Sequence, residues 1–210
     1  MNKKQLEITL SKLKDNPNPR VELEQYTIPS DLAAEILNLA YLNGDVKGKV
    51  VVDLGCGSGR LMIGAALMDA KKVIGIDVNK DVLAIAKENV KIAERLTNQE
   101  IGTRIKLVCK DVSDWDGNVD TIIQNPPFGI QKLHADRHFL QKALECARKI
   151  YSLHRHYEKS RIFLKKLIEQ NGGKVEKIIK FKFKIPYMFK FHKKPYAIYD
   201  VDLFIISRLR

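Results

Sequence analysis

The sequence predicts an α/β fold in which a mostly parallel sheet ends in an antiparallel pair of strands. Short β-branched runs alternate with helical segments between residues 49 and 170, as in successive βαβ units. Two strand-like runs near the end of the chain, 174–185 and 197–208, have no helix between them, which favours antiparallel pairing. The length of 210 residues suits a single domain, and 45 % hydrophobic with 30 % charged residues is typical of a globular protein.

Two helices precede the alternating region. Leucines recur at helical spacing in residues 6–13 and predict a short amphipathic helix, which the Asn-Pro-Asn-Pro segment 16–19 ends. Ser30 predicts the N-cap of a second helix that continues to residue 42. Strands are then expected at 49–54, 72–78, 105–109 and 119–124, with a short fifth strand at 150–153, and helices at 58–68, 81–96, 137–149 and 158–170.

Lysine alternates with phenylalanine or isoleucine in residues 180–185, so this strand has one apolar face and one lysine-coated face. The apolar side chains are expected in the core, although aromatic rings beside lysines also suit nucleic-acid binding. Lysines on an edge strand have a second use, because they prevent edge-to-edge aggregation.

Composition excludes several classes of protein. No stretch approaches the roughly 20 apolar residues of a membrane-spanning helix, and the N-terminus lacks the pattern of a secretory signal. The three cysteines, Cys56, Cys109 and Cys146, are odd in number and far apart, so neither a zinc site nor a disulfide framework is expected. The five histidines also lack ligand spacing, so no metal site is expected. A reducing cytoplasm is the expected location.

The positive charge is concentrated in the second part of the chain. The net charge is +12. Residues 1–131 carry 17 Lys and Arg against 18 Asp and Glu, whereas residues 132–210 carry 20 against 7. This asymmetry favours a polyanionic partner such as RNA, although a Lys-rich solvated surface is the simpler alternative.

The glycine-rich segment Asp53-Leu54-Gly55-Cys56-Gly57-Ser58-Gly59 lies between the first strand and the next helix, where open α/β sheets bind ligands. Arg60 stands where a dinucleotide fingerprint would have its third glycine, and no P-loop pattern is present. Asp77 ends the second strand and suits the ribose hydroxyls of an adenosine ligand. Asp111, followed by Val112, ends the third strand and suits an adenine amino group. The alternative is a tight turn with capping carboxylates and no ligand.

The segment Asn125-Pro126-Pro127-Phe128 follows the fourth strand and is the most specific signal in the chain. Two consecutive prolines predict a rigid turn that offers two acceptors, the Asn125 side-chain oxygen and the Pro126 carbonyl. Two such acceptors can hold both N–H groups of an exocyclic amine and free its lone pair for attack on a methyl group. Phe128 offers a face for stacking on a flat ring. A proline-stiffened loop with a packed phenylalanine is the alternative.

These motifs resemble those of the class I S-adenosylmethionine-dependent methyltransferases, and the Asn-Pro-Pro-Phe turn resembles that of enzymes acting on adenine N6, guanine N2 or glutamine amides. Segments 23–26, 53–59, 125–129, 151–154 and 190–194 together resemble the small archaeal and eukaryotic enzymes that form N6-methyladenosine in small-subunit ribosomal RNA, the methyltransferase-like protein five family. The resemblance covers almost the whole chain. It implies a Rossmann-like, mostly parallel seven-stranded sheet with an antiparallel C-terminal edge strand and helices on both faces.

The resemblance also implies S-adenosylmethionine as cofactor and S-adenosylhomocysteine as product. Family contacts carry over to Gln25, Gly55, Ser58, Arg60, Asp77 and Asp111, with Asp53, Gly57, Gly59 and Val112 beside them in the same motifs. Residues 1–45 are expected to form a helical segment that closes over the cofactor, and residues 46–210 the α/β core of one methyltransferase domain. Gln25 and Tyr26 would cover the methionine end, with a further contact from either Thr27 or the backbone of Ile28.

The expected partner is RNA, with small-subunit ribosomal RNA favoured. Basic and aromatic residues near the C-terminus are the candidate RNA contacts: Tyr187, Phe189, Lys190, Phe191, His192, Lys193 and Lys194. Eukaryotic members of the family act with a small zinc-containing activator protein bound along a sheet edge, which makes such a protein a candidate partner. Two other functions stay open: methylation of guanine N2 or of a protein glutamine, and RNA binding without catalysis.

Overall fold

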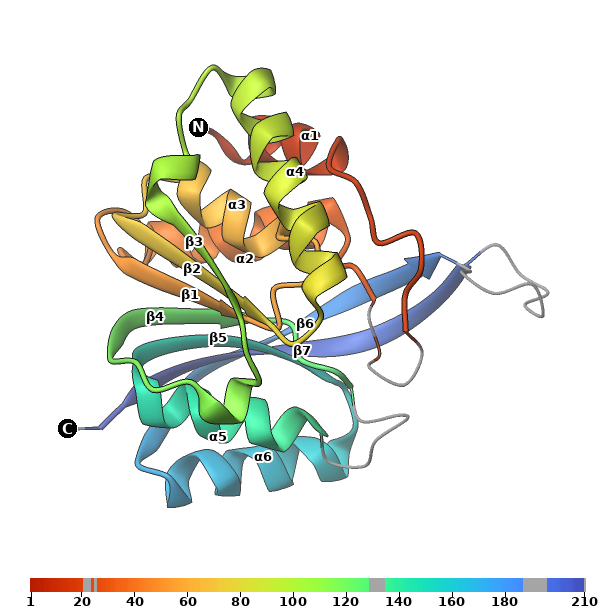
Figure 1. Cartoon of the computed structure of the whole chain (residues 1–210). Helices are drawn as coiled ribbons and strands as arrows, with labels where there is room; N and C mark the ends of the chain where they lie inside the picture. The colour runs from red at the N-terminus through yellow and green to blue at the C-terminus, as the bar shows by residue number, and fades with distance from the viewer. Residues whose placement is uncertain (21–23, 25, 129–134, 187–195, 210) are drawn as a thin grey trace.

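A computed structural model describes residues 1–20, 24, 26–128, 135–186 and 196–209, which form one seven-stranded sheet between two helical layers (Figure 1). The strands lie in the order β3-β2-β1-β4-β5-β7-β6. Their bounds are Val50–Leu54 (β1), Lys72–Asp77 (β2), Ile105–Cys109 (β3), Val119–Gln124 (β4), Ala147–Arg155 (β5), Gly173–Pro186 (β6) and Tyr196–Arg208 (β7).

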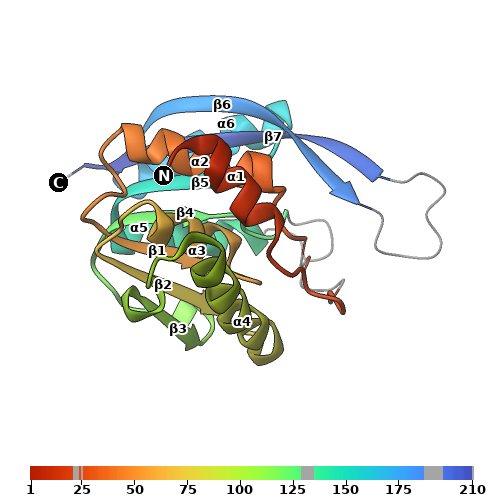
Figure 2. The ribbon, with the colours of Figure 1, turned by 90° about the horizontal axis from the view of Figure 1, so that it is seen from above.

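Helices cover both faces of the sheet, as Figures 1 and 2 show. One layer holds α1 (Lys3–Ser11), α2 (Ser30–Leu42), α3 (Arg60–Leu67) and α4 (Lys80–Thr97), and the other holds α5 (Ala135–Cys146) and α6 (Glu158–Gln170). Short 3₁₀ turns precede and follow β3, at Gly102–Arg104 (η2) and Val112–Asp114 (η3). None of the described helices is long and apolar enough to span a bilayer.

Alternation along the strands divides the interior into two cores. In β4, Ile123 packs with the helices of the first layer and Ile122 with α5 and α6. Because consecutive side chains of a strand point to opposite faces, a strand that is covered on both faces reads as a continuous apolar run. The runs at 50–52 and 203–206 are of this kind.

The predicted fold class is confirmed. The pairs β1–β2, β2–β3, β1–β4 and β4–β5 are parallel, whereas β5–β7 and β6–β7 are antiparallel. The C-terminal strand β7 is antiparallel but lies one place inside the edge, between β5 and β6. Residues 201–206 of β7 are all buried, whereas β6 exposes Lys180, Lys182 and Lys184, so β6 is the strand suited to the solvent-facing edge.

Some predicted boundaries differ from those in the structure. The helix predicted to reach residue 149 ends at Cys146, because residues 147–155 pair with β4 and β7 as a strand longer than expected. The helix predicted from residue 58 begins at Arg60, because Gly59 is its N-cap with a φ of 89°. Ser30 is the first residue of α2, and Pro29 is its N-cap.

Parallel pairing brings the functional motifs to one edge of the sheet. Leu54 at the end of β1 lies between Ile76 of β2 and Gln124 of β4. The glycine segment after β1, Asp77 and the proline turn after β4 are therefore neighbours. The carbonyl oxygen of Ile76 accepts hydrogen bonds from the backbone N–H groups of Gly55 and Cys56 at 2.8 and 2.9 Å, which holds the glycine turn against β2.

Candidate active site

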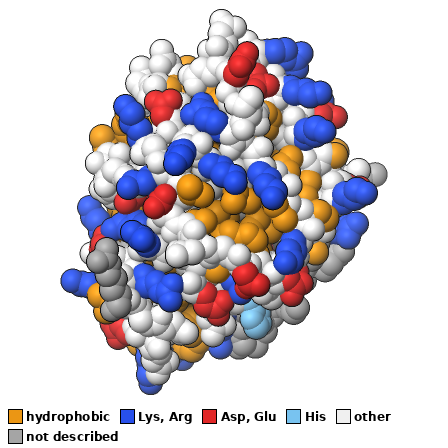
Figure 3. Space-filling view, turned by 60° about the vertical axis from the view of Figure 1, so that its left-hand side comes forward, with side chains coloured by type: hydrophobic (Ala, Val, Ile, Leu, Met, Phe, Trp, Pro, Cys, Tyr) orange, Lys and Arg blue, Asp and Glu red, His pale blue; other side chains and the backbone are white. Residues whose placement is uncertain are grey.

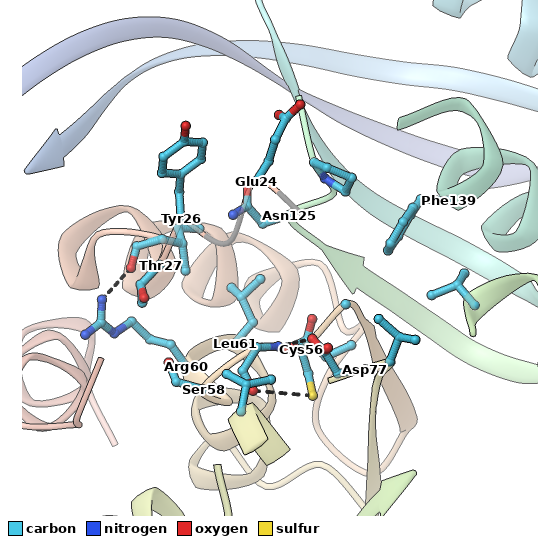
Figure 4. Close-up of a pocket in the computed structure, with 18 of the residues that line it drawn as sticks. Glu24, Tyr26, Thr27, Cys56, Ser58, Arg60, Leu61, Asp77, Asn125 and Phe139 are labelled. Carbon is cyan, nitrogen blue, oxygen red and sulfur yellow. Dashed lines mark hydrogen bonds between the residues drawn. The ribbon is translucent and has the colours of Figure 1, made fainter. Parts of the chain in front are cut away.

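A cavity of about 270 Å³ opens at the carboxyl ends of β1, β2 and β4. Its walls come from the segment before α2, the glycine turn, the ends of β2 and β3, the proline turn and the first part of α5. In the view of Figure 4, Asn125 and Glu24 lie at one end of the group of lining residues and Cys56 and Asp77 at the other. The cavity therefore unites motifs that the sequence places up to about a hundred residues apart.

The glycine turn lines the cavity through Gly55, Gly57 and Ser58, and Gly59 lies behind it as the N-cap of α3. All three glycines have positive φ, 72°, 52° and 89°, which explains why the turn needs glycine. A Cβ added to Gly55 would lie 2.9 Å from Cε1 of Phe139, so the backbone here is in close contact with the ring from α5. The glycine turn and α5 therefore pack so closely at Gly55 that no side chain would fit between them.

Asp77 is the carboxylate at the end of β2, and it lines the cavity from a buried position. Each of its oxygens accepts one backbone N–H at 2.9 Å, Oδ2 from Gly57 and Oδ1 from Asn79. Burial raises the pKa of Asp77, and the hydrogen bonds from these backbone groups oppose the shift. A carboxylate oxygen has lone pairs beyond one hydrogen bond, so Asp77 keeps acceptor capacity for hydroxyl groups.

Asp53 also lines the cavity, and only 3 % of its surface is exposed. Its Oδ2 accepts the backbone N–H of Met62 in the first turn of α3 at 3.0 Å. Burial raises its pKa to about 8, the Met62 hydrogen bond opposes the shift, and the nearby Asp77 adds to it. Asp53 therefore ties the start of α3 to β1, in addition to forming part of the wall.

The end of β3 contributes Asp111 and Val112 to the cavity. Asp111 is exposed and caps the short turn η3, where its Oδ1 accepts the backbone N–H of Ser113 at 2.8 Å. Val112 is buried in the core beneath α5. Asp111 therefore caps this turn and also lines the cavity.

The segment before α2 covers one side of the cavity with Tyr26, Thr27 and Ile28. Arg60 at the start of α3 holds this segment. Its Nη1 donates to the carbonyl oxygen of Ile28 at 2.6 Å (Figure 4), and its Nη2 donates to Oδ1 of Asp15 at 2.9 Å. Arg60 lines the cavity, but its described hydrogen bonds are made to this segment. Gln25 lies outside the described residues.

The proline turn presents Asn125 and Pro127 to the cavity, whereas Pro126 and Phe128 are not among its lining residues. Oδ1 of Asn125 is buried and has no hydrogen-bond partner among the described residues. Phe128 packs edge-on against Phe183 of β6, with ring centroids 5.4 Å apart. The ring is half-buried against the core, because an apolar side chain gains more from this packing than from exposure to the solvent.

Several lining residues were not expected from the sequence. Glu24 is buried with a φ of 47°, and His138 and Phe139 project from α5. Glu24 stands within the segment that resembles the methyltransferases, but no local pattern distinguishes it from a surface glutamate. His138 and Phe139 reach the cavity because of how α5 packs, which residue spacing does not reveal.

The predicted RNA contacts at 187 and 189–194 lie outside the described residues. Within the described ranges, no group of three or more His, Cys, Asp or Glu side chains is placed to hold a metal ion. The cysteines at 56, 109 and 146 are free thiols.

Comparisons with known proteins indicate the same kind of enzyme as the motifs around the cavity do. A family model, the methyltransferase small domain, matches residues 29–179. The rRNA N6-adenosine-methyltransferase METTL5 of Danio rerio is 35 % identical over 96 % of this chain and 97 % of its own length. An uncharacterised protein of Methanocaldococcus jannaschii is 42 % identical over 99 % of this chain and 94 % of its own.

A crystal structure from Pyrococcus horikoshii superposes with a TM-score of 0.91 at 41 % identity, covering 100 % of this chain and 99 % of that one. The family match spans well over half of the chain, and the relatives match it nearly from end to end. The chain belongs to the methyltransferase small domain family and is a methyltransferase.

Proposed function

We propose that this protein uses S-adenosylmethionine to form N6-methyladenosine in small-subunit ribosomal RNA. The observation that carries the proposal is the buried Oδ1 of Asn125, which belongs to a cavity-lining residue and has no partner in the described part of the chain. A buried acceptor without a partner is costly unless a ligand supplies the donor. An exocyclic amine is such a donor.

The residues of the cavity fit the cofactor. No described atom beyond its chain neighbours lies within 4 Å of a Cβ added to Gly57, so the glycine turn leaves open space for a ligand there, and Asp77 retains acceptor capacity for ribose hydroxyls. Asp111 and Val112 would lie beside the adenine. When bound, S-adenosylmethionine supplies a methyl group on a positively charged sulfur. We assign the methionine end to the segment 25–28, with Thr27 or the backbone of Ile28 as the contact.

Asn125 and the carbonyl of Pro126 would accept the two N–H groups of the target amine and orient its lone pair away from the ring. The nitrogen would gain a bond to the methyl carbon as the bond from that carbon to sulfur breaks, and it would then give up a proton. The chain needs no strong general base for this step, because the proton becomes acidic after transfer. Catalysis on this account comes from positioning and from fixed acceptors. Phe128 is proposed to stack on the target ring, which would require it to move from its edge-on packing with Phe183 toward the cavity, because it does not line the cavity in this structure.

The distribution of positive charge and the names of the relatives both favour RNA as the substrate. Residues 132–210 hold the excess of positive charge, and β6 exposes lysines on one face. Relatives in Danio rerio and Caenorhabditis elegans, 35 % and 30 % identical, carry the name rRNA N6-adenosine-methyltransferase. The target base would leave its stack to enter the cavity, as in other enzymes that modify bases. Residues 187 and 189–194 are proposed to contact this RNA.

The segment 1–45 is proposed to close over the cofactor. The bond from Arg60 to Ile28 and the contacts of Asn89 support this role. Asn89 is fully buried, exchanges hydrogen bonds with the backbone of Lys14 and donates to the carbonyl of Ser58. The segment is therefore fastened to both the glycine turn and α4.

A small zinc-containing activator protein remains a candidate partner. Strand β3 is the edge of the sheet opposite β6, and among the described strands it pairs only with β2. Figure 3 shows an apolar area on one face of the molecule, with Lys and Arg side chains above and beside it and Asp and Glu side chains below it. An open strand edge and an apolar surface suit a protein partner that adds to the sheet.

The test is methyl transfer from tritiated S-adenosylmethionine to a panel of substrates, followed by nucleoside mass spectrometry. The panel holds small ribosomal subunits, naked small-subunit RNA, tRNA and a protein extract, each with and without a zinc-containing activator. Label in N6-methyladenosine of small-subunit RNA is expected. Label in N2-methylguanosine or in protein would replace the substrate and retain the chemistry. Failure to bind the cofactor would instead favour RNA binding without catalysis.

A further inference from the structure

Four polar side chains form a buried hydrogen-bonded chain beside the cavity. Nε2 of Gln124 donates to Oγ of Ser152 at 2.8 Å, and this Oγ lies 2.8 Å from Nε2 of His154. Nδ1 of His154 lies 3.3 Å from Oδ2 of Asp136. Gln124, Ser152 and His154 are each at most 1 % exposed. None of the four lines the cavity, so the function described above does not account for them.

One assignment of donors and acceptors satisfies all three hydrogen bonds, with each group donating to the next from Gln124 to Asp136. The Gln124 amide donates to Ser152, whose single hydroxyl proton is then free to bond Nε2 of His154. This makes Nε2 an acceptor and puts the ring proton on Nδ1, which donates to the Asp136 carboxylate. The ring of His154 packs edge-on against Phe204, with the ring centroids 5.5 Å apart.

These hydrogen-bonded side chains join two walls of the cavity. Gln124 is the last residue of β4 and directly precedes Asn125, whose Oδ1 has no described partner of its own. Asp136 lies in the first turn of α5, two and three residues before the cavity-lining His138 and Phe139. The hydrogen bonds therefore connect the end of β4 to the start of α5 through β5.

We propose that Ser152, His154 and Asp136 are positioning residues, which act through Gln124 to hold Asn125 in the geometry needed for methyl transfer. The proposal rests on the proposed role of Asn125. An unanchored Asn125 would sample side-chain positions in which its oxygen cannot meet the amine, and small misplacements of such groups are known to cost large factors in rate. Hydrogen bonds that continue from β4 to α5 restrict this freedom, although Oε1 of Gln124 has no partner among the described residues.

The competing explanation is that the four groups merely satisfy one another in the core. The structure offers a matched control on the adjacent residue. Tyr151 points to the opposite face of β5, where its hydroxyl donates to Asp45 at 2.6 Å and accepts from Asn43 at 2.8 Å. Tyr151→Phe removes two partly buried hydrogen bonds and Ser152→Ala removes two buried ones, but the Tyr151 bonds have no connection to Asn125.

The experiment compares Ser152→Ala and Tyr151→Phe at a temperature well below both melting points. Ser152→Ala is expected to lower kcat at least about tenfold, while KM for RNA and the Kd of S-adenosylmethionine change less than twofold. Tyr151→Phe is expected to lower the melting temperature by a similar amount and leave kcat within twofold. Equal effects of the two variants on kcat, or an unchanged kcat in Ser152→Ala, would overturn the proposal.

Asp136 gives a second test in which the variant is less at risk of misfolding, because the Asp136 side chain is partly accessible to solvent. Asp136→Asn retains an oxygen acceptor for Nδ1–H and should keep most of kcat, whereas Asp136→Ala should lose most of it.

An NMR measurement of Asn125 needs no substrate. The side-chain amide signal of Asn125 is identified by its loss in Asn125→Ala. This signal should shift or broaden in Ser152→Ala and Asp136→Ala but not in Tyr151→Phe. If the wild-type protein methylates no RNA, this signal still decides the proposal. An unchanged signal in both variants would refute it.

Discussion

At the scale of single residues, Asp53 predicts how stability depends on pH. Its carboxyl titrates near pH 8 in the folded protein, compared with an ordinary pKa of 3.8. The folded state therefore binds more protons than the unfolded state between these values, and stability falls as the pH rises from about 4 to about 8. Asp53 thus destabilises the folded chain at alkaline pH by remaining charged in a buried position.

Asp53→Asn keeps an oxygen that can accept the Met62 N–H and stays neutral at every pH. Its melting temperature should exceed that of the wild type at pH 9, and the difference should shrink steadily toward pH 5. Thermal melts in a series of buffers measure this. Asp77, whose pKa is also raised, is present in both proteins, and its interaction with the Asp53 charge is part of the difference because it adds to the Asp53 shift. A difference that is constant with pH would show that Asp53 is not the titrating group.

The residues that the sequence identified are those whose chemistry is visible in a short motif. The glycines, Asp77 and Asn125 stand directly after strands, so their arrival at one sheet edge follows from parallel pairing. Glu24 and Phe139 have no such motif. They reach the cavity through the packing of distant segments, and only the tertiary structure shows this.

At the scale of elements, Arg60 connects the N-terminal segment to α3. Arg60→Lys removes the two-pronged contact with Ile28 and Asp15 and keeps the charge. If the segment closes over the cofactor, the Kd of S-adenosylhomocysteine should rise about tenfold, the effect of roughly 1.4 kcal/mol. Isothermal titration calorimetry measures the change.

Asp15→Asn is the control for this prediction, because the Asp15 side chain is 60 % exposed and its ion pair should contribute little. This variant keeps the bond from Arg60 to the Ile28 carbonyl and should alter the Kd less than twofold. Equal effects from the two variants, or no effect from Arg60→Lys, would contradict the closing role of the segment.

Element boundaries were predicted less well than element types. Strands 105–109 and 119–124 and helix 158–170 were predicted with their observed bounds, because turn residues or changes in periodicity mark both ends. The junction of α5 and β5 was misplaced, since residues 147–149 have no local mark and become strand through pairing with β4 and β7. Tertiary contacts override weak local preference at such a place.

At the scale of the whole molecule, the concentration of positive charge predicts salt-sensitive RNA binding. Strand β6 runs in the same direction as β4, so its lysine-rich end lies at the edge of the sheet that holds the cavity. The triple variant Lys180→Gln, Lys182→Gln, Lys184→Gln should raise KM for RNA about tenfold at physiological salt. The slope of log affinity against log salt should fall by one to two units.

Lys3, Lys4 and Lys14 provide the matched control at the opposite end of the chain. They carry the same total charge and, like Lys180 and Lys182, they form ion pairs with carboxylates. Their replacement with glutamine should leave the salt slope unchanged. Similar slopes for the two triple variants would mean that net charge alone, without a defined RNA surface, drives binding.

The most direct test of the account is the amount of N6-methyladenosine that wild-type protein and Asn125→Ala form in small-subunit RNA, measured by nucleoside mass spectrometry. The account predicts a loss of at least about 100-fold in the variant, the size seen when one fixed polar group at a reacting centre is removed. The Kd of S-adenosylmethionine should stay within twofold. Turnover within tenfold of the wild type, at equal cofactor occupancy, would contradict the claim that Asn125 holds the reacting amine.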